Sequence, residues 1–148
     1  MSLLDSPAIA QGAKDVVADT RVTGYSWTWW DGHCARRRPM WRIADKDEAA
    51  KLQAERVAFN NIIQGTGSDF LLRSMIELVK WIRMEGIPAK VCLPVHDSLL
   101  LEAQEDYADE VIQQTVSIMT GWNSMGVPLT VDVEKGPSWG DLKKIKKQ

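Results

Sequence analysis

Two apolar runs separated by only two polar residues constrain the fold of this chain more than any other feature. The runs are "AKVCLPV", residues 89–95, and "SLLLEA", residues 98–103, and His96 and Asp97 stand between them. Such a short link between two strand-like runs predicts a tight β-hairpin. A pair of this kind is most often only a solvated turn, but a hairpin tip also holds a carboxylate rigidly in space.

A second hairpin is predicted closer to the N-terminus. Asp31-Gly32 is a strong turn signal, and aromatic and β-branched residues flank it on both sides, which predicts strands over residues 22–30 and 36–43. Four of the seven tryptophans lie in this segment, so part of its aromatic surface should be packed. A helical pattern precedes it over residues 6–19, with Ser6 as a possible cap.

Helical periodicity dominates the middle of the chain. A helix is expected to begin at Asp45, with Glu48 completing the cap, and Gly65 and Gly67 interrupt its pattern. The following segments are a second helix over residues 68–85, a third over 105–120 and a last strand over 128–136. This order predicts an α+β fold in which helices cover an antiparallel sheet.

Three polar residues of the long helix are spaced to share one face. Arg56, Asn60 and Gln64 follow one another at intervals of four. Such a row can be no more than a solvated face. The same side chains also contact phosphates and the acceptors of the DNA minor groove, where binding is largely indifferent to sequence.

Composition excludes several classes of protein. The formal net charge of −2 gives no global basic field, although residues 36–38 and the lysine-rich tail are local basic clusters. Two cysteines provide no disulfide framework and fit a reducing compartment. No signal peptide and no membrane span are recognisable, so a cytoplasmic location is expected.

Two groups of residues are candidates for binding a metal ion. Asp97 on a hairpin tip is a suitable ligand for Mg²⁺, which accepts few protein oxygens, but two-metal phosphoryl transfer needs a second carboxylate from elsewhere. The other group, two histidines and two cysteines, matches no zinc spacing, and packed thiols explain the cysteines better. Its members are His33, Cys34, Cys92 and His96.

Together, "AERVAFNNIIQGTGSDF" and "LPVHDSLLLE" resemble the C-terminal palm of family A DNA polymerases, the bacterial polymerase I and phage replicase family. The flanking segments "VTGYSWTWWDGHCARRRPMWRI" and "VPLTVDVEKGPSWGD" are similar to that family as well, so the resemblance covers about residues 22–141. It implies a palm-like antiparallel sheet with a motif C hairpin over residues 22–148, preceded by a helical segment over residues 1–21. A bacterial or phage-infected cell is the implied location.

The resemblance implies a role for each matching residue. Asp97 corresponds to the metal-binding aspartate of motif C, and His96 to the neighbour that touches the primer terminus. The helical row would hold primer–template DNA in its minor groove. Glu102 matches a family acid and is a second candidate metal ligand. By weaker analogy, a basic cluster would contact the DNA backbone, and its members are Arg36, Arg37 and Arg38.

Two departures from the family pattern qualify this interpretation. Ser98 stands where the family usually has a glutamate after the motif C aspartate. The first catalytic aspartate and the fingers helix, with its nucleotide-binding Lys and Tyr, lie upstream in the family and are not recognisable here. The chain is therefore expected to be inactive alone and to need Mg²⁺, deoxynucleoside triphosphates, primer–template DNA and the missing polymerase portion or a partner subunit.

Two hypotheses follow. In the first, the chain is the C-terminal piece of a polymerase, from a split gene or a longer chain. In the second, it is a truncated, non-catalytic module that binds duplex DNA or self-associates through its exposed apolar surface.

Overall fold

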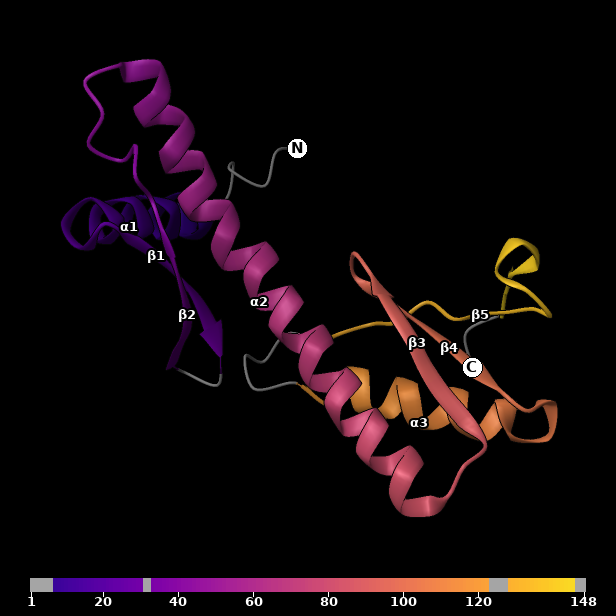
Figure 1. The fold of residues 1–148 in the computed structure, drawn as a ribbon. Coiled ribbons are helices and arrows are strands. Elements are labelled where there is room, and N and C mark those ends of the chain that lie inside the picture. The colour runs from indigo at the N-terminus through magenta and orange to yellow at the C-terminus, as the bar shows by residue number, and fades with distance from the viewer. Residues whose placement is uncertain (1–6, 31–32, 123–127, 146–148) are drawn as a thin grey trace. The chain divides into compact units, whose positions relative to one another are not determined.

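The fold mixes helices with antiparallel strands, which confirms the α+β class (Figure 1). The computed structural model describes residues 7–30, 33–122 and 128–145. The chain divides into two compact units, and the boundary lies between Asp69 and Phe70. Within the described residues the strands form three separate two-stranded sheets in place of one covered sheet. The elements are α1 (Pro7–Thr23), β1 (Tyr25–Trp30), β2 (His33–Pro39), α2 (Glu48–Glu85), β3 (Ala89–Val95), β4 (Ser98–Ala103), η2 (Glu105–Tyr107), α3 (Ala108–Thr120), β5 (Glu134–Lys135), η3 (Trp139–Asp141) and β6 (Lys143–Lys144).

The first helix is longer than its sequence pattern indicated. It continues to Thr23, so the prediction that a strand starts at Val22 is wrong. Gly24 ends the helix with a φ of 75°, and its N–H donates to the carbonyl of Thr20 at 2.8 Å. A glycine in this left-handed conformation is a common helix stop, because it has no Cβ to strain the backbone. The expected cap Ser6 lies outside the described residues.

Strands β1 and β2 form the predicted N-terminal hairpin. Their register pairs Trp30 with His33, which agrees with a turn at Asp31-Gly32, although the turn itself lies outside the described residues. An irregularity between Trp27 and Trp29 shifts the pairing. The second strand ends at Pro39 and not at Ile43, because the chain turns there and carries Met40 and Ile43 into the core.

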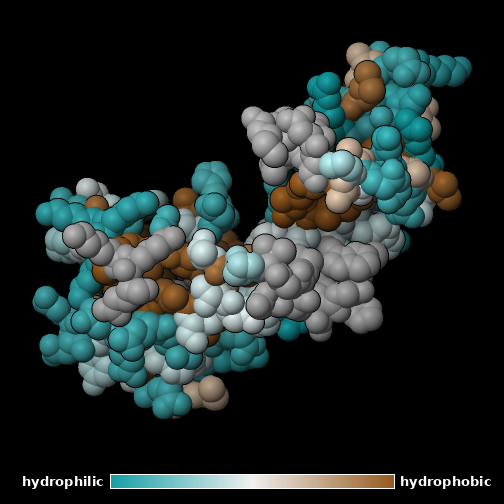
Figure 2. All heavy atoms as spheres, turned by 180° about the vertical axis from the view of Figure 1, so that it is seen from behind, coloured by the Kyte–Doolittle hydropathy of each residue, from teal (hydrophilic) through white to brown (hydrophobic). Residues whose placement is uncertain are grey.

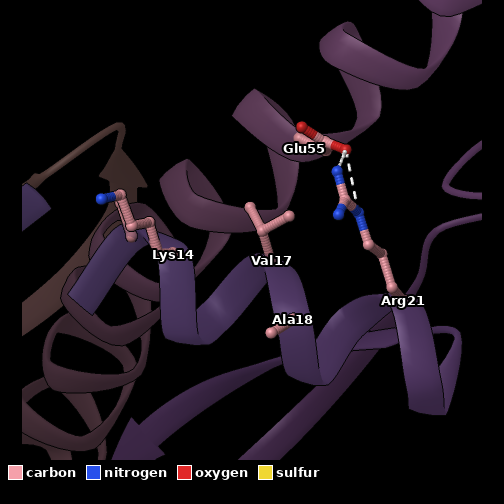
Figure 3. A pocket seen from close by; sticks show the side chains of 6 residues that line it. Lys14, Val17, Ala18, Arg21 and Glu55 are labelled. Atoms are coloured by element: carbon pink, nitrogen blue, oxygen red, sulfur yellow. Dashed lines mark hydrogen bonds and ion pairs between the residues drawn. The ribbon is translucent and has the colours of Figure 1, made fainter. Parts of the chain in front are cut away.

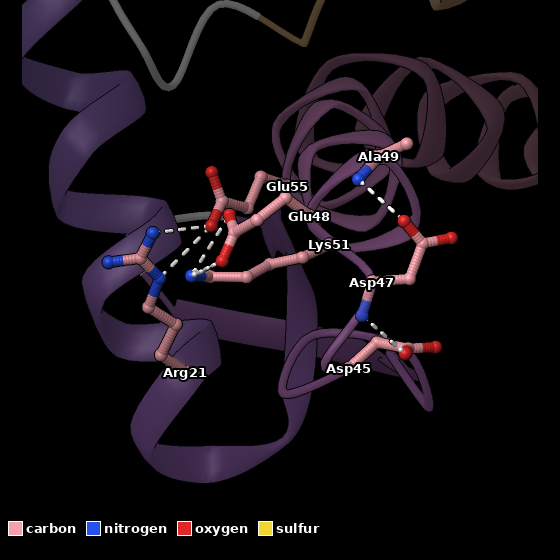
Figure 4. A network of polar contacts seen from close by, with 7 residues as sticks. All are labelled: Arg21, Asp45, Asp47, Glu48, Ala49, Lys51 and Glu55. Carbon is pink, nitrogen blue, oxygen red and sulfur yellow. Dashed lines mark hydrogen bonds and ion pairs between the residues drawn. The ribbon is translucent and has the colours of Figure 1, made fainter.

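The start of α2 corrects the predicted cap by two residues (Figure 4). The carboxylate of Asp47 accepts a hydrogen bond from the N–H of Ala49 at 3.0 Å, which is the geometry of an N-cap. Asp45 lies two residues earlier, and its carboxylate accepts a hydrogen bond from the N–H of Asp47 at 3.0 Å. Both acids therefore organise the chain before Glu48, where the helix begins.

Helix α2 is continuous where two helices were predicted. Gly65 and Gly67 both lie inside it. A Cβ added to Gly65 would overlap the Cγ2 methyl of Thr28, so this glycine allows the hairpin to approach the helix closely. Tertiary contact of this kind readily outweighs the helix penalty of about 1 kcal/mol that a glycine carries.

The first unit, residues 1–69, has a small core between α1, α2 and the segment after β2. Its buried members are Met40, Ile43, Ala54 and Ala58, and Val16 and Val57 pack against them. The hairpin is tied to α2 by Ser26, which is 1% exposed. Its hydroxyl donates to the carbonyl of Ala58 at 2.7 Å and accepts from the side-chain amide of Asn61 at 3.2 Å.

The second unit, residues 70–148, is built around the later turns of α2. Gly86 ends the helix as predicted, with a φ of 65°, and the N–H of Ile87 donates to the carbonyl of Ile82. Trp122, just after α3, donates from its indole N–H to the hydroxyl of Ser74 at 2.7 Å. The buried apolar side chains are Leu71, Leu78, Ile82 and Val111.

The C-terminal strand is much shorter than predicted. Of residues 128–136, only Glu134 and Lys135 form a strand, and they pair with Lys143 and Lys144 in the tail. A strand persists only where a neighbour receives its backbone hydrogen bonds, and this pairing covers two residues of each strand. The remainder of the predicted strand has no ladder among the described residues.

No helix in the described parts of the chain is long and apolar enough to cross a membrane. On the face drawn in Figure 2, hydrophobic residues show as separate patches among hydrophilic ones in both units. The side chains that remain exposed include Ile76, Met84 and Leu93 of the second unit. Exposed apolar groups in this number indicate surface that a partner could cover.

Candidate functional site

The hairpin of β3 and β4 carries His96 and Asp97 on its tip, as predicted. Val95 pairs with Ser98, so the turn contains only the two polar residues, and both are exposed. His96 has a φ of 54°, a conformation that costs a non-glycine residue energy and that is concentrated at functional sites. The tip therefore presents one carboxylate and one imidazole from a fixed backbone.

Ser98 has a structural role at the position where the family usually has a glutamate. Its hydroxyl donates to the carbonyl of Val95 at 2.8 Å, across the base of the turn. A serine at this position thus closes the turn with its own side chain, as Ser and Thr often do in tight turns. The hairpin tip gains rigidity from this bond and has only one carboxylate.

Glu102 lies toward the open end of the same hairpin. It pairs with Lys90 in the strand register, and its carboxylate lies 3.1 Å from the Lys90 ammonium. The hydrogen bond that Lys90 donates to the Glu102 carboxylate, followed by the negative charge of that carboxylate, raises the pKa of Lys90. Four strand steps separate Glu102 from Ser98, which is about 13 Å at the usual rise per residue. The hairpin therefore does not bring Glu102 to Asp97.

The predicted polar row on α2 is exposed along its whole length. Arg56, Asn60 and Gln64 are all open to solvent, while Ala54 and Ala58 are buried in the core of the first unit. The helix therefore presents the row outward, as a surface that binds a groove requires. Exposure alone is equally compatible with a solvated face.

The basic cluster of β2 divides into three different environments. Arg36 forms an ion pair with Asp69 at 2.6 Å, and the Asp69 side chain is only 13% exposed. The guanidinium of Arg37 lies 4.8 Å above the ring of Tyr25, which is a cation–π contact. Arg38 is exposed. The three arginines look equivalent in the sequence, but in the structure they differ. Arg36 connects β2 to α2 through its ion pair with Asp69.

A shallow hollow between α1 and α2 contains none of the predicted site residues (Figure 3). Arg21 crosses it and donates to the carboxylate of Glu55, and Lys14 lies at its rim. The ion pair satisfies the main charges, so the hollow is best explained as a contact between two helices.

The donor set can be compared with what Mg²⁺ requires. Among the described residues, no group of three or more His, Cys, Asp or Glu side chains is arranged to hold a metal ion. Asp97 is an exposed carboxylate on a rigid tip, which suits an ion that binds one or two carboxylates and completes its shell with phosphates and water. A two-metal centre requires at least two carboxylates close together, and Asp97 provides one.

Sequence reasoning missed several of these contacts. The pairing of Trp27 with Arg37 follows from counting outward from the Asp31-Gly32 turn, but only if the irregularity between Trp27 and Trp29 is known. The ion pair of Arg36 with Asp69 joins residues 33 positions apart, and no local pattern indicates it.

Comparison with known proteins gives a consistent result. Residues 5–141 match the family model described as DNA polymerase family A. The chain is 32% identical to DNA polymerase I of Geobacillus stearothermophilus over 137 residues, which is 93% of this chain and 15% of the relative. It is 36% identical to DNA polymerase I of Pseudomonas aeruginosa over 106 residues, which is 72% of this chain and 12% of the relative.

A solved structure agrees with this assignment. The POL domain of Pol1 from M. smegmatis, in complex with DNA primer-template and dNTP, matches with a TM-score of 0.73 and 31% identity. The match covers 81% of this chain and 20% of that chain. The present chain thus spans between 12% and 15% of these two curated relatives. From its hairpin motif, its helical row and these matches, the chain belongs to DNA polymerase family A.

Proposed function

We propose that this chain is the C-terminal part of the palm of a DNA-directed DNA polymerase and is inactive alone. The observation that carries the proposal is the family match over residues 5–141 together with an exposed Asp97 on a two-residue turn. The chain spans only a small share of its relatives, so the remaining catalytic parts must come from elsewhere. Those parts are the first catalytic aspartate and the fingers helix.

In this proposal Asp97 is the residue that holds Mg²⁺. Family A polymerases generally use Mg²⁺, which lowers the barrier to phosphoryl transfer by activating the attacking oxygen and neutralising charge on the phosphates. The contribution of the chain is to fix the carboxylate with a tight turn. The bond from Ser98 to Val95 and the constrained backbone of His96 both support that position. His96 would contact the primer terminus beside it.

Glu102 remains a weaker candidate in this scheme. Its carboxylate is engaged by Lys90, and it lies away from the turn. We propose that it contributes a negative charge at the base of the hairpin and does not share an ion with Asp97. Glu102→Gln should then reduce primer extension far less than Asp97→Asn does. Equal losses in the two variants would contradict this ranking.

The helical row is proposed to hold the minor groove of the primer–template duplex. Arg56, Asn60 and Gln64 are exposed hydrogen-bond donors on one face of α2, and their targets are acceptors present at every base pair. Arg38 and Arg37 would contact the backbone from the neighbouring hairpin. Arg36 contributes less, because Asp69 already occupies its guanidinium.

Reconstitution tests the catalytic proposal. The matched C-terminal segment of the Geobacillus enzyme would be deleted, and this chain would be fused or added in its place. We expect primer extension only when both parts are present. Asp97→Asn should reduce it to background, whereas Asp106→Asn, an exposed acid in η2, should leave it intact. No extension by the wild-type pair, or full activity with Asp97→Asn, would refute the enzyme proposal.

Duplex binding tests the row separately. Arg56→Ala should weaken binding and reduce the slope of log K against log salt by about 0.9. Gln64→Ala should weaken binding equally for unrelated sequences. Arg83→Ala, an exposed arginine later in the same helix, is the control and should change little. Unchanged binding in both row variants would remove the minor-groove assignment.

A non-catalytic module is the second candidate function. The exposed apolar side chains favour it, since Met84 is 76% exposed and Ile76 is 49% exposed. If the chain is such a module, it should dimerise or bind duplex DNA without the missing portion. Sedimentation of the isolated chain, alone and with DNA, distinguishes this from a palm fragment that assembles only with its complement.

A further inference from the structure

The hairpin of β1 and β2 has two faces with different chemistry. Ser26 and Thr28 point to α2 and are 1% and 3% exposed. Since side chains alternate along a strand, Tyr25 and Trp27 lie on the other face. Trp27 pairs with Arg37 across the strands, so Arg37 shares that face.

The outer face combines aromatic rings with a stacked cation. The Tyr25 and Trp27 ring centroids are 6.4 Å apart with their planes tilted by 48°. The Arg37 guanidinium carbon lies over the Tyr25 ring, 4.8 Å from its centroid, and the Arg37 side chain is exposed. A guanidinium held on a ring presents its second planar face outward, where another flat group can stack.

This aromatic face is not needed to attach the hairpin to the helix. The hydroxyl of Ser26 and the methyl group of Thr28, which lies against Gly65, make that attachment. Tyr25 and Trp27 also lie outside the core cluster of the first unit. The outer face is therefore a half-buried surface of rings and positive charge that remains available for a ligand.

We propose that Tyr25, Trp27 and Arg37 form a stacking platform for the unpaired bases of single-stranded DNA. Nucleobases stack on aromatic rings and on guanidinium planes without regard to sequence, and adjacent arginines attract the phosphates. Arg38 pairs with Ser26 and so belongs to the opposite face of the hairpin, which leaves Arg37 as the cation of the platform itself. The inference does not use Asp97 or the helical row, so its failure would leave those two parts of the proposed function intact. It shares Arg37 with the proposed backbone contacts, and the Trp27 variants therefore carry the test of the platform.

If the platform stacks bases, its affinity for DNA should depend on the bases and not only on the sugar–phosphate backbone. The first test compares oligomers with and without bases. The intact chain would be titrated into end-labelled oligothymidylate at low salt, with fluorescence anisotropy as the readout. A base-free deoxyribose-phosphate oligomer of equal length should bind at least about fivefold more weakly, since each stacked base contributes a factor of roughly 5 to 150. Equal binding of the two oligomers, or no binding of oligothymidylate, would overturn the proposal. This comparison needs no variant.

Substitutions then assign the platform to its residues. Trp27→Ala should weaken oligothymidylate binding by roughly 5- to 150-fold, and Trp27→Phe by less, because a ring remains. Arg37→Ala should also reduce the salt slope by about 0.7, the value for one phosphate of a single strand. Trp139→Ala is the matched control, since Trp139 is 61% exposed in the second unit. Circular dichroism would verify that each variant is folded.

Two further results would contradict the inference. If blunt duplex DNA competes as well as oligothymidylate in a chain whose helical row is disabled by Arg56→Ala and Gln64→Ala, the surface binds backbone charge and does not stack bases. If Trp27→Ala binds oligothymidylate normally but impairs reconstitution with the missing polymerase portion, the aromatic face is a protein interface. Loss of oligothymidylate binding with normal duplex binding is the result that supports a single-strand platform.

Discussion

Gly65 and Gly67 provide a controlled test of why α2 is continuous. Both lie inside the helix, but their surroundings differ. A Cβ on Gly67 would meet nothing within 4 Å, whereas a Cβ on Gly65 would overlap the Cγ2 of Thr28. Alanine is the better helix former by about 1 kcal/mol, so the two substitutions share the same gain and differ in the clash.

The magnitudes follow from these surroundings. Gly67→Ala should increase the free energy of unfolding by about 0.4–1 kcal/mol. Gly65→Ala receives the same gain but adds an overpacking cost of about 1–3 kcal/mol, because Thr28 is 3% exposed and has little room to move. The two variants should therefore differ by about 1–3 kcal/mol, with Gly65→Ala the less stable.

A double-mutant cycle identifies the cause. Thr28→Ser removes only Cγ2 and keeps the hydroxyl that accepts from the Arg36 N–H at 3.0 Å. In the Gly65→Ala background it should restore stability, with a coupling of about 1–2 kcal/mol. Urea denaturation followed by circular dichroism gives all four values. Equal stabilisation by both alanines, or no rescue by Thr28→Ser, would refute the close-approach argument.

Three further outcomes are expected from the same denaturation assay. His96→Gly should stabilise the chain by about 1 kcal/mol, because glycine accepts the φ of 54° without strain; a loss of stability would contradict a strained turn. Ser26→Ala should cost about 1–3 kcal/mol, since it leaves a buried carbonyl and an amide without their hydroxyl partner, and a change near zero would contradict this. The Asp47 N–H and then Arg42 hold the pKa of Asp45 below its ordinary value of 3.8, so its contribution to stability is full above that pH and is lost as the pH falls through the lowered pKa. Asp45→Asn should abolish that pH dependence. If the variant and the wild-type chain lose stability in the same way as the pH falls, Asp45 is not the group responsible.

The sequence predicted best what depends on neighbouring residues. Both strands of the motif C hairpin have the predicted bounds, because a two-residue link and two apolar runs leave almost no other pairing. The stop of α2 at Gly86 was also predicted, since a left-handed glycine and a following Pro88 are local signals. The exposed helical row followed from spacing alone.

Two of the errors share a physical cause, which is contact, or its absence, between residues distant in the sequence. Gly65 was read as a helix break because its propensity is local, while the reason for its presence is Thr28 on another element. A strand was predicted over residues 128–136, but among the described residues it has a pairing partner only at Glu134 and Lys135. Periodicity indicates what a segment can form, and the neighbours determine what it does form.

Asp97 and Ser98 illustrate how a local bond can change the chemistry of a site. A glutamate directly after Asp97 would add a second carboxylate, and so a second negative charge, at the hairpin tip where the proposed function places Mg²⁺. Ser98 instead uses its side chain to close the turn onto Val95. The tip of this chain is therefore stiffer and less acidic. Under the proposed function, other carboxylates would have to supply the charge that two metal ions require. Activity in the reconstituted enzyme should then depend more steeply on Mg²⁺ concentration than in the Geobacillus relative, and Ser98→Glu should reduce that dependence.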